Sequence, residues 1–280
     1  MKVIKKVISI SKIANNIRLK KNTIGFIPTM GALHEGHLFL IQKAREENDI
    51  VIVSIFVNPK QFTNAHDLEK YPHNIERDRL LIESYADYLF VPSEQEMYPS
   101  DFHTSITVGD HAHDLEGKFR PGHFEGMATV VHKFLTICVP TRAYFGLKDY
   151  QQFMVVSQMV EDLNINVKII GVPTVRDESG LAMSSRNVQL SDEDRKVAAQ
   201  IHKALLDTKN KIISGERNSH IIEKYCMDLL LQIPNSKIEY VAVRTLPLKR
   251  TQIIQSDIVL LVALSIGNVR LIDNIIVYND

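Results

Sequence analysis

The sequence has no excess charge of either sign: 33 lysines and arginines balance 33 aspartates and glutamates in 280 residues. This balance gives no overall electrostatic reason to bind nucleic acid. Long apolar runs are also missing, because residues 258–264 fall far short of the ~20 residues that a membrane helix needs. Lysines interrupt the opening stretch MKVIKKVISI too early for a secretory signal. We therefore expect a cytoplasmic protein with no nucleic-acid or membrane partner.

Cysteine is scarce, with only Cys138 and Cys226, and no Cys-x-x-Cys pair occurs. Each cysteine lies in an apolar segment, so we expect two buried, reduced thiols, as in a reducing compartment. A chain of this length can bury a substantial core without disulfide or metal cross-links.

Two common phosphate-binding motifs are absent. Gly31 and Gly36 have the spacing of a P-loop, but His37 and Leu38 stand where that motif needs Lys and Ser or Thr. No Gly-x-Gly-x-x-Gly occurs, which excludes the dinucleotide-binding fingerprint.

The first part of the chain alternates short apolar runs with amphipathic segments, a pattern typical of a parallel sheet crossed by helices. It predicts strands at 24–28, 50–57, 88–91, 143–145 and 167–172, and helices at 37–47, 75–85, 124–138 and 150–163. The continuous β-branched run at 50–57 is typical of a strand buried on both faces. We expect an α/β domain over residues 1–175, with an open, doubly wound, Rossmann-like sheet.

The pattern changes after residue 175. Residues 176–187 are polar and contain glycine, which predicts a linker or a mobile loop. Ser191, with Asp194 three residues later, predicts the capped start of a long helix. A second helix at 221–232 and strands at 238–243, 258–264 and 269–277 follow. Helices followed by strands indicate a smaller α+β domain over residues 176–280, which we expect to act as a lid.

The strongest chemical signal is the segment PTMGALHEGH at 28–37, between the first expected strand and the first expected helix. Ligands of open α/β sheets bind beside such turns, and the first amides of a helix favour an anion. Glycines at 31 and 36 allow close backbone approach, and His34 and His37 would add ring N–H donors. This donor set suits a triphosphate. The same local sequence would also fit an ordinary strand-to-helix turn with two surface histidines.

A second cluster is LAMSSRN at 181–187, in which two serines and an arginine can bind phosphate oxygens. Alone it is compatible with a serine-rich loop. Together with the His-x-Gly-His segment it resembles the two-part ATP site of the nucleotidyltransferase superfamily, which includes the class I aminoacyl-tRNA synthetases.

Further segments make the resemblance specific. The chain carries FVNPKQF at 56–62, Tyr71-Pro72, RPGHFEGMATVV at 120–131 and FGLKDYQQ at 145–152. In this order, and with the two candidate ATP loops, they resemble the pantothenate synthetase (pantoate–β-alanine ligase) family. The similarity spans residues 27–187.

The resemblance implies an enzyme that joins pantoate to β-alanine through a pantoyl-adenylate, using ATP and Mg²⁺ and releasing AMP and pyrophosphate. It implies a homodimer and makes His37 the catalytic histidine. We add His34, Lys148 and Arg186 as catalytic groups that neutralise the phosphates. Gln61 is expected to bind both pantoate and β-alanine, and Gln152 pantoate. The implied ATP contacts come from Met30, Gly31, Ala32, Leu33, His34, Glu35, Gly36, His37, Gly146, Leu147, Lys148, Asp149, Val175, Met183, Ser184, Ser185 and Arg186.

Several of these residues also have a purely structural interpretation. Gln61 could cap a loop, Lys148 could be solvated, and Asp149 could cap a helix instead of binding ribose. His123 could line the pocket or serve only the start of its helix.

The chain departs from the family pattern at three positions. Leu147 stands where Glu is frequent, His73 where Arg is common, and Arg77 where an acidic residue near Mg²⁺ is expected. Asp78 is retained. We therefore assign no protein ligand to the metal ion.

Three alternatives remain open from sequence alone. One is another acyl-adenylate-forming enzyme or nucleotidyltransferase with a different acceptor. A second is a zinc hydrolase using His34 and His37, or His111 and His113. A third is a non-catalytic nucleotide-binding or scaffold protein, which would bind ATP without consuming it.

Overall fold

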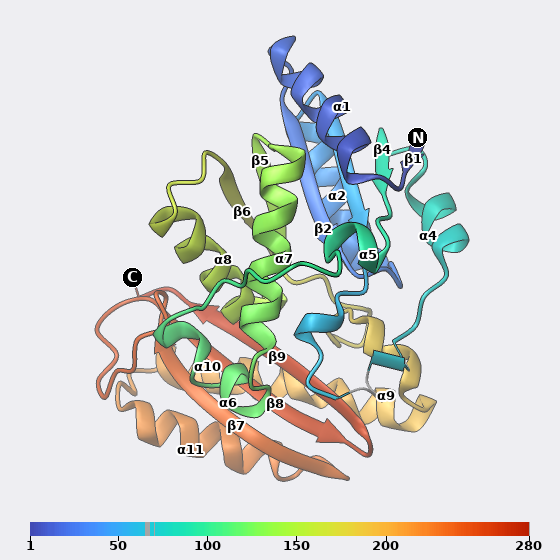
Figure 1. Ribbon diagram of the computed structural model, residues 1–280. Helices are drawn as coiled ribbons and strands as arrows, with labels where there is room; N and C mark the ends of the chain where they lie inside the picture. Colours follow the sequence, from blue (N-terminus) through green and yellow to red (C-terminus); the bar gives the residue numbers. More distant parts are fainter. Residues whose placement is uncertain (65–67, 70, 280) are drawn as a thin grey trace. The chain divides into compact units, whose positions relative to one another are not determined.

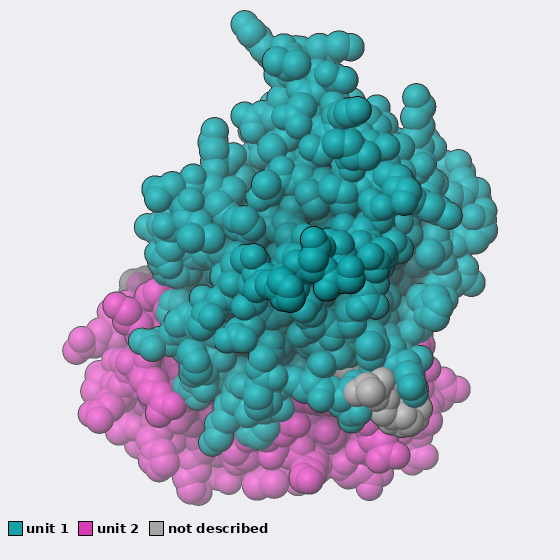
Figure 2. Space-filling model, viewed as in Figure 1, with its two compact units in different colours: residues 1–147, 151–173 teal, residues 148–150, 174–280 magenta. Residues whose placement is uncertain are grey.

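The computed structural model describes residues 1–64, 68–69 and 71–279 (Figure 1). It divides into two compact units, coloured separately in Figure 2. Unit 1 comprises Met1–Leu147 and Gln151–Pro173, and unit 2 comprises Lys148–Tyr150 and the chain from Thr174 onward. The division falls two residues before the boundary expected from sequence, and it assigns the short segment after β5 to unit 2.

Unit 1 contains a six-stranded sheet in the order β1-β4-β3-β2-β5-β6, and all its pairs are parallel. The strands are β1 Lys2–Ile4, β2 Ile24–Thr29, β3 Ile50–Ile55, β4 Tyr88–Phe90, β5 Arg142–Gly146 and β6 Lys168–Val172. After its first residue β3 is buried throughout, as its continuous apolar run predicts. The expected parallel α/β sheet is confirmed.

Helices cover both faces of this sheet, because neighbouring strand residues point in opposite directions. Phe26 of β2 packs in a core with residues of α1 and α7, whereas Ile27 packs in a second core with residues of α2 and α4. The helical segments of this part of the chain are α1 Val7–Leu19, α2 Glu35–Glu47, η1 Pro59–Gln61, α4 Ile75–Ile82, α5 Glu94–Met97, η2 Asp110–Ala112, α6 Glu116–Phe119, α7 His123–Cys138, η3 Leu147–Asp149 and α8 Tyr150–Asp162.

Strand β1 and helix α1 were not predicted. Strand β1 has only three residues, too few for a period-2 pattern. Helix α1 does carry a usable signal, since its buried Ile10, Ala14 and Ile17 recur at helical spacing. Its β-branched residues obscure that spacing, because they favour strands.

Unit 2 is an α+β unit, as expected. It contains η4 Ser185–Gln189, the helices α9 Asp192–Ala198, α10 Gln200–Ile213 and α11 Ser219–Leu230, and the strands β7 Ser236–Thr245, β8 Ile258–Ile266 and β9 Val269–Val277. The strands form an antiparallel sheet in the order β7-β8-β9. Its apolar core is shared by the sheet and all three helices, and includes Ala198, Leu205, Cys226 and Leu260.

The start expected at Ser191 is confirmed, because its Oγ accepts a hydrogen bond from the Asp194 amide at 3.0 Å. The single long helix expected from there is wrong. The helix breaks for one residue at Ala199, where φ −59° and ψ −24° are closer to a 3₁₀ turn than to an α-helix. Alanine is the best helix former, so the residue type itself gives no warning of the break.

Two expectations based on absences can be compared with the structure. Cys138 and Cys226 are both buried and free, as predicted. Burial raises the pKa of both thiols, that of Cys226 to about 11. Within the described residues, no helix combines the length and apolar character needed to cross a membrane.

Candidate active site

The loop between β2 and α2 occupies the point where the strand order of the unit 1 sheet reverses. Strands β3 and β4 continue the sheet on one side of β2, and β5 and β6 continue it on the other. Ligands of open parallel sheets bind outside the carboxyl ends of the strands at such a point. The loop leaves β2 at Thr29 and enters α2 at Glu35. Gly146 ends the neighbouring strand β5 at the same edge.

The backbone of this loop has a conformation that only a few residues accept. Gly31 has φ +84° and Ala32 has φ +51°. A Cβ atom on Gly31 would lie 3.1 Å from Cγ2 of Ile55 and 3.2 Å from Oδ2 of Asp78. The Gly31 amide donates to Oγ1 of Thr29 at 3.2 Å. The backbone angle therefore favours glycine at 31, and a Cβ atom there would also crowd Ile55 and Asp78.

Helix α4 holds the same loop from the side. The carboxylate Oδ1 of Asp78 accepts from the Leu33 amide at 2.9 Å, and Nη1 of Arg77 donates to the Leu33 carbonyl at 3.1 Å. Asp78 is only 1% exposed, and its second oxygen, Oδ2, has no hydrogen-bond partner. Arg77, which departs from the family pattern, thus contacts the loop backbone. We did not predict this contact, because a separation of 44 residues leaves no local pattern.

The two loop histidines are anchored through the same ring atom. Nδ1 of His34 accepts from the Gly36 amide at 3.2 Å, and Nδ1 of His37 accepts from the His34 amide at 3.4 Å. Their ring centroids lie 4.1 Å apart. Since Nδ1 is the acceptor in each ring, the neutral tautomer carries its hydrogen on Nε2. Both imidazoles can therefore act as Nε2–H donors, and neither is a fully exposed surface histidine.

Gln61 lies beside this loop, as expected from the neighbouring strands β2 and β3. Its Nε2 donates to Sδ of Met30 at 3.2 Å, and its Oε1 accepts from Nδ2 of Asn58 at 2.9 Å. Asn58 in turn donates to the Gly126 carbonyl and accepts from the Tyr98 hydroxyl. Gln61 is buried, so its amide is held in a defined orientation.

Helix α7 supports Gln61 from behind. Nδ1 of His123 donates to the Gln61 carbonyl at 2.8 Å, and its Nε2 lies 3.2 Å from Nη1 of Arg120, as an acceptor. A Cβ atom at Gly126 would lie 2.2 Å from the Lys60 carbonyl oxygen, so the backbones of α7 and η1 are in direct contact. The RPGHFEG segment thus packs against the η1 backbone, and His123, the first residue of α7, holds the Gln61 carbonyl.

Gln152 is partly buried in α8, and its substrate role stays a prediction. The side-chain amide of the preceding Gln151 is hydrogen-bonded within the protein. Its Oε1 accepts from the Glu116 amide, and its Nε2 donates to the carbonyls of His111 and Asp114.

In unit 2, Lys148 is more buried than a solvated lysine would be. Its side chain is 17% exposed, with Nζ 4.0 Å from Oδ2 of Asp149. Its carbonyl accepts from Nδ2 of Asn274 at 2.8 Å. Asp149 lies within η3 and is half exposed.

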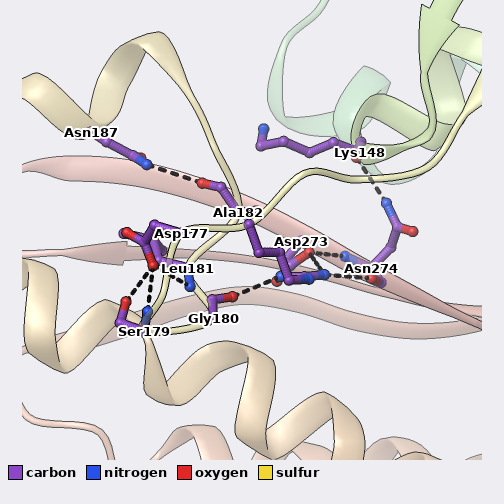
Figure 3. A network of polar contacts seen from close by, with 10 residues as sticks. Lys148, Asp177, Ser179, Gly180, Leu181, Ala182, Asn187, Asp273 and Asn274 are labelled. Atoms are coloured by element: carbon purple, nitrogen blue, oxygen red, sulfur yellow. Dashed lines mark hydrogen bonds and ion pairs between the residues drawn. The ribbon is translucent and has the colours of Figure 1, made fainter. Parts of the chain in front are cut away.

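The segment expected as a linker is a closed turn with internal hydrogen bonds (Figure 3). The Met183 amide donates to the Val175 carbonyl at 2.9 Å, which brings these two predicted ATP contacts together. Oδ1 of Asp177 accepts from the amides of Ser179 and Leu181. Ser184 caps η4, because its Oγ accepts from the Arg186 amide at 3.3 Å. The predicted contacts in this segment therefore form one group within unit 2, and Met30–His37 with Gln61 form another within unit 1.

A family model described as "Pantoate-beta-alanine ligase" matches residues 2–276 of this chain. The chain belongs to the pantoate–β-alanine ligase family. The match extends beyond residues 27–187, from which the resemblance was first drawn, and covers both units.

Relatives in this family resemble the chain over nearly its whole length. Pantothenate synthetase from Thermotoga petrophila is 47% identical over 278 residues, with 99% of each chain covered. The crystal structure of pantothenate synthetase from Thermus thermophilus has a TM-score of 0.93 at 41% identity and covers 100% of both chains. The pantoate–β-alanine ligase of Francisella tularensis, complexed with "Beta-gamma ATP and Beta-alanine", has a TM-score of 0.79 at 40% identity, covering 98% of this chain and 97% of that one. The expected fold and the ligase class are confirmed.

Membership in the pantoate–β-alanine ligase family argues against the zinc-hydrolase alternative. Among the described residues, no group of three or more His, Cys, Asp or Glu side chains could hold a metal ion. His111 and His113, considered as zinc ligands, lie at η2, where Nδ1 of His113 bonds the Gly109 carbonyl.

Proposed function

We propose that this enzyme condenses pantoate with β-alanine at the expense of ATP, through a pantoyl-adenylate. The observation that carries the proposal is the family match over residues 2–276. The "Beta-gamma ATP" and β-alanine named for the Francisella relative support ATP and β-alanine as ligands here.

In the first step, a carboxylate oxygen of pantoate attacks the α-phosphorus of ATP. The bond from that phosphorus to the β-phosphate oxygen breaks, and pyrophosphate leaves. The Nε2–H groups of His34 and His37, beside the amino end of α2, suit the negative charge that develops on the phosphates. In this scheme His37 acts as a hydrogen-bond donor and not as a base.

We propose that unit 2 supplies the remaining positive and hydroxyl groups to the same nucleotide. Lys148 and Arg186 would neutralise phosphate charge, and Ser184 and Ser185 would donate hydroxyl hydrogen bonds. Asp149 suits a ribose hydroxyl. The remaining proposed ATP contacts are Met30, Gly31, Ala32, Leu33, Glu35, Gly36, Gly146, Leu147, Val175 and Met183.

In the second step, the neutral amine of β-alanine attacks the acyl carbon of the adenylate. The new C–N bond forms, AMP departs, and the amine loses a proton. Gln61 retains one N–H and one lone pair beyond its contacts with Met30 and Asn58, which suits the pantoate carboxylate and hydroxyls and also β-alanine. Gln152 is our second proposed pantoate contact. Excluding water matters here, because the mixed anhydride hydrolyses readily.

We also propose that Mg²⁺ accompanies ATP. Mg²⁺ is usually held by one or two carboxylates together with substrate phosphates, so it needs no cage of protein ligands. The unpartnered Oδ2 of Asp78 beside Gly31 is a fitting oxygen on the unit 1 side. When bound, the ion would screen phosphate charge during the departure of pyrophosphate.

A coupled assay for AMP tests the proposal. AMP should appear only when ATP, pantoate and β-alanine are all present. Pantoate alone should support exchange of labelled pyrophosphate into ATP. Exchange driven by a different acid would favour another adenylate-forming enzyme, and ATP binding without AMP formation would favour the non-catalytic alternative. Light scattering at about twice the 31.9 kDa chain mass would support the homodimer that we propose. We also propose a cytoplasmic location.

A further inference from the structure

Two adjacent polar residues of strand β9 are buried without a role in the site proposed above. Asp273 is 5% exposed and Asn274 is 6% exposed. Their side chains point to opposite faces of the sheet. A single solvent-facing side of the sheet therefore cannot explain why both residues are polar. Burying a carboxylate and an amide costs free energy unless both are hydrogen-bonded, so their partners indicate what they are for.

Asp273 holds the turn that carries the serine and arginine contacts. Its two oxygens accept from Nη1 and Nη2 of Arg176 at 2.7 and 2.9 Å, the paired geometry that guanidinium and carboxylate prefer. Nη1 of Arg176 also donates to the Gly180 carbonyl at 3.2 Å, across the turn. The ion pair thus fixes both arms of the turn that ends at Val175 and Met183.

Asn274 connects the same strand to Lys148. Its side-chain Nδ2 donates to the Lys148 carbonyl at 2.8 Å, and its backbone N–H donates to Oδ1 of Asp273 at 2.8 Å. Figure 3 shows the resulting network within unit 2, from Lys148 through β9 to the turn. It joins segments that are 126 and 97 residues apart in the sequence.

We infer that Asp273 and Asn274 are positioning residues that set Lys148 and the 175–186 segment in one fixed arrangement. Neither is among the substrate contacts proposed above. They act on the reaction through the phosphate-binding groups. That the bound nucleotide is ATP rests on the proposed function. A shift of ~1 Å in such groups can lower a rate by about 10²-fold, so positioning of this kind is catalytically important.

The experiment replaces Asn274 with aspartate, which has the same shape but cannot donate to the Lys148 carbonyl. We expect kcat/KM for ATP in pantoate-dependent pyrophosphate exchange to fall at least ~10-fold, within the range that misplacement of a reacting group produces. KM for pantoate should stay within about twofold, because its proposed contacts are in unit 1. Asn274→Ser, which is too short to reach the carbonyl, is the second variant if the buried aspartate prevents folding.

Glu239→Gln is the matched control. Glu239 of β7 pairs with Arg270 of β9 at 2.7 Å in the same sheet, and its described contacts include neither Lys148 nor Arg176. It should lower thermal stability without changing kcat/KM for ATP. If the Asn274 variants and Glu239→Gln give the same kcat/KM for ATP, the residues are merely structural and the inference is wrong.

A second measurement separates this inference from the proposed function. The rise in melting temperature caused by ATP alone needs no pantoate chemistry, and it should shrink in both Asn274 variants but not in Glu239→Gln. If the unaltered enzyme shows the ATP-induced rise but no pantoate-dependent exchange, the proposed function is wrong. The ATP-induced rise in the Asn274 variants still tests whether Asn274 positions the phosphate-binding groups. An unchanged rise in the Asn274 variants would overturn the inference whatever the reaction is.

Discussion

The two loops proposed to bind ATP are each anchored by an arginine and an aspartate, but in different ways. In unit 1 the Arg77 side chain is 58% exposed although that of Asp78 is 1% exposed, and the loop also depends on positive φ angles at Gly31 and Ala32. In unit 2 the Arg176–Asp273 pair is buried, at 17% and 5% exposed. The first loop thus depends mainly on its own backbone conformation, and the second on a buried ion pair.

The comparison predicts unequal effects of removing the two arginines. Arg176→Met should lower the free energy of unfolding by about 3 kcal/mol, because it leaves the Asp273 carboxylate buried without its cation. Arg77→Met should cost less, about 1 kcal/mol, because the Arg77 side chain is 58% exposed and the buried Asp78 carboxylate keeps its hydrogen bond from the Leu33 amide. Urea denaturation of both variants measures the difference. Equal losses would mean that the two anchors are equivalent.

The second prediction concerns the imidazoles, which only the unit 1 loop has. His37→Ala should reduce turnover by at least ~10²-fold, the scale of losing a key polar group in the transition state. Steady-state AMP release measures this effect. His113→Ala, at an exposed position of the same unit, is the control and should keep full activity. A His37→Ala enzyme of near-normal rate would remove this ring from the mechanism.

The third prediction separates backbone strain from crowding. Gly31→Ala should destabilise the enzyme by about 2 kcal/mol or more, because a positive φ costs alanine ~1–2 kcal/mol and the added Cβ is also crowded. Gly215→Ala in unit 2 has φ +109° with open space around it, so only the strain remains. The difference between their unfolding midpoints measures the crowding. No difference would show that Ile55 and Asp78 move aside freely.

The smallest expected effect is a pH dependence in unit 2. Burial lowers the pKa of His202 below its usual 6.5, the Arg176 charge lowers it further, and Asp273 opposes the shift. The unfolded chain therefore takes up this proton first, so stability is complete above pH 6.5 and declines as the pH falls below it. His202→Gln should flatten the loss between pH 7.5 and 5.5 in urea denaturation. His220→Gln, exposed in α11, should leave it unchanged.

Sequence patterns predicted most of the fold because they are local. The apolar runs located strands β2 to β9, and the Ser191 cap marked the start of α9. The His-x-Gly-His loop was also recognisable, since strand, glycines and histidines follow one another directly.

The anchors of both loops could not be predicted from sequence. Asp78 contacts a backbone amide 45 residues away, and Arg176 pairs with a carboxylate 97 residues away. Such pairs have no fixed spacing, and Asp273-Asn274 within an apolar strand gives no indication of its partners. Distant side-chain contacts of this kind become visible only when the chain is folded.

The closeness of α7 to the Lys60 carbonyl limits how the enzyme could be re-engineered. Because no side chain fits at residue 126, a mutant library meant to admit other acids cannot vary that position without pushing Gln61 out of place. Diversity would have to be introduced away from this helix, and also away from Met30 and Asn58, because their hydrogen bonds orient the Gln61 amide.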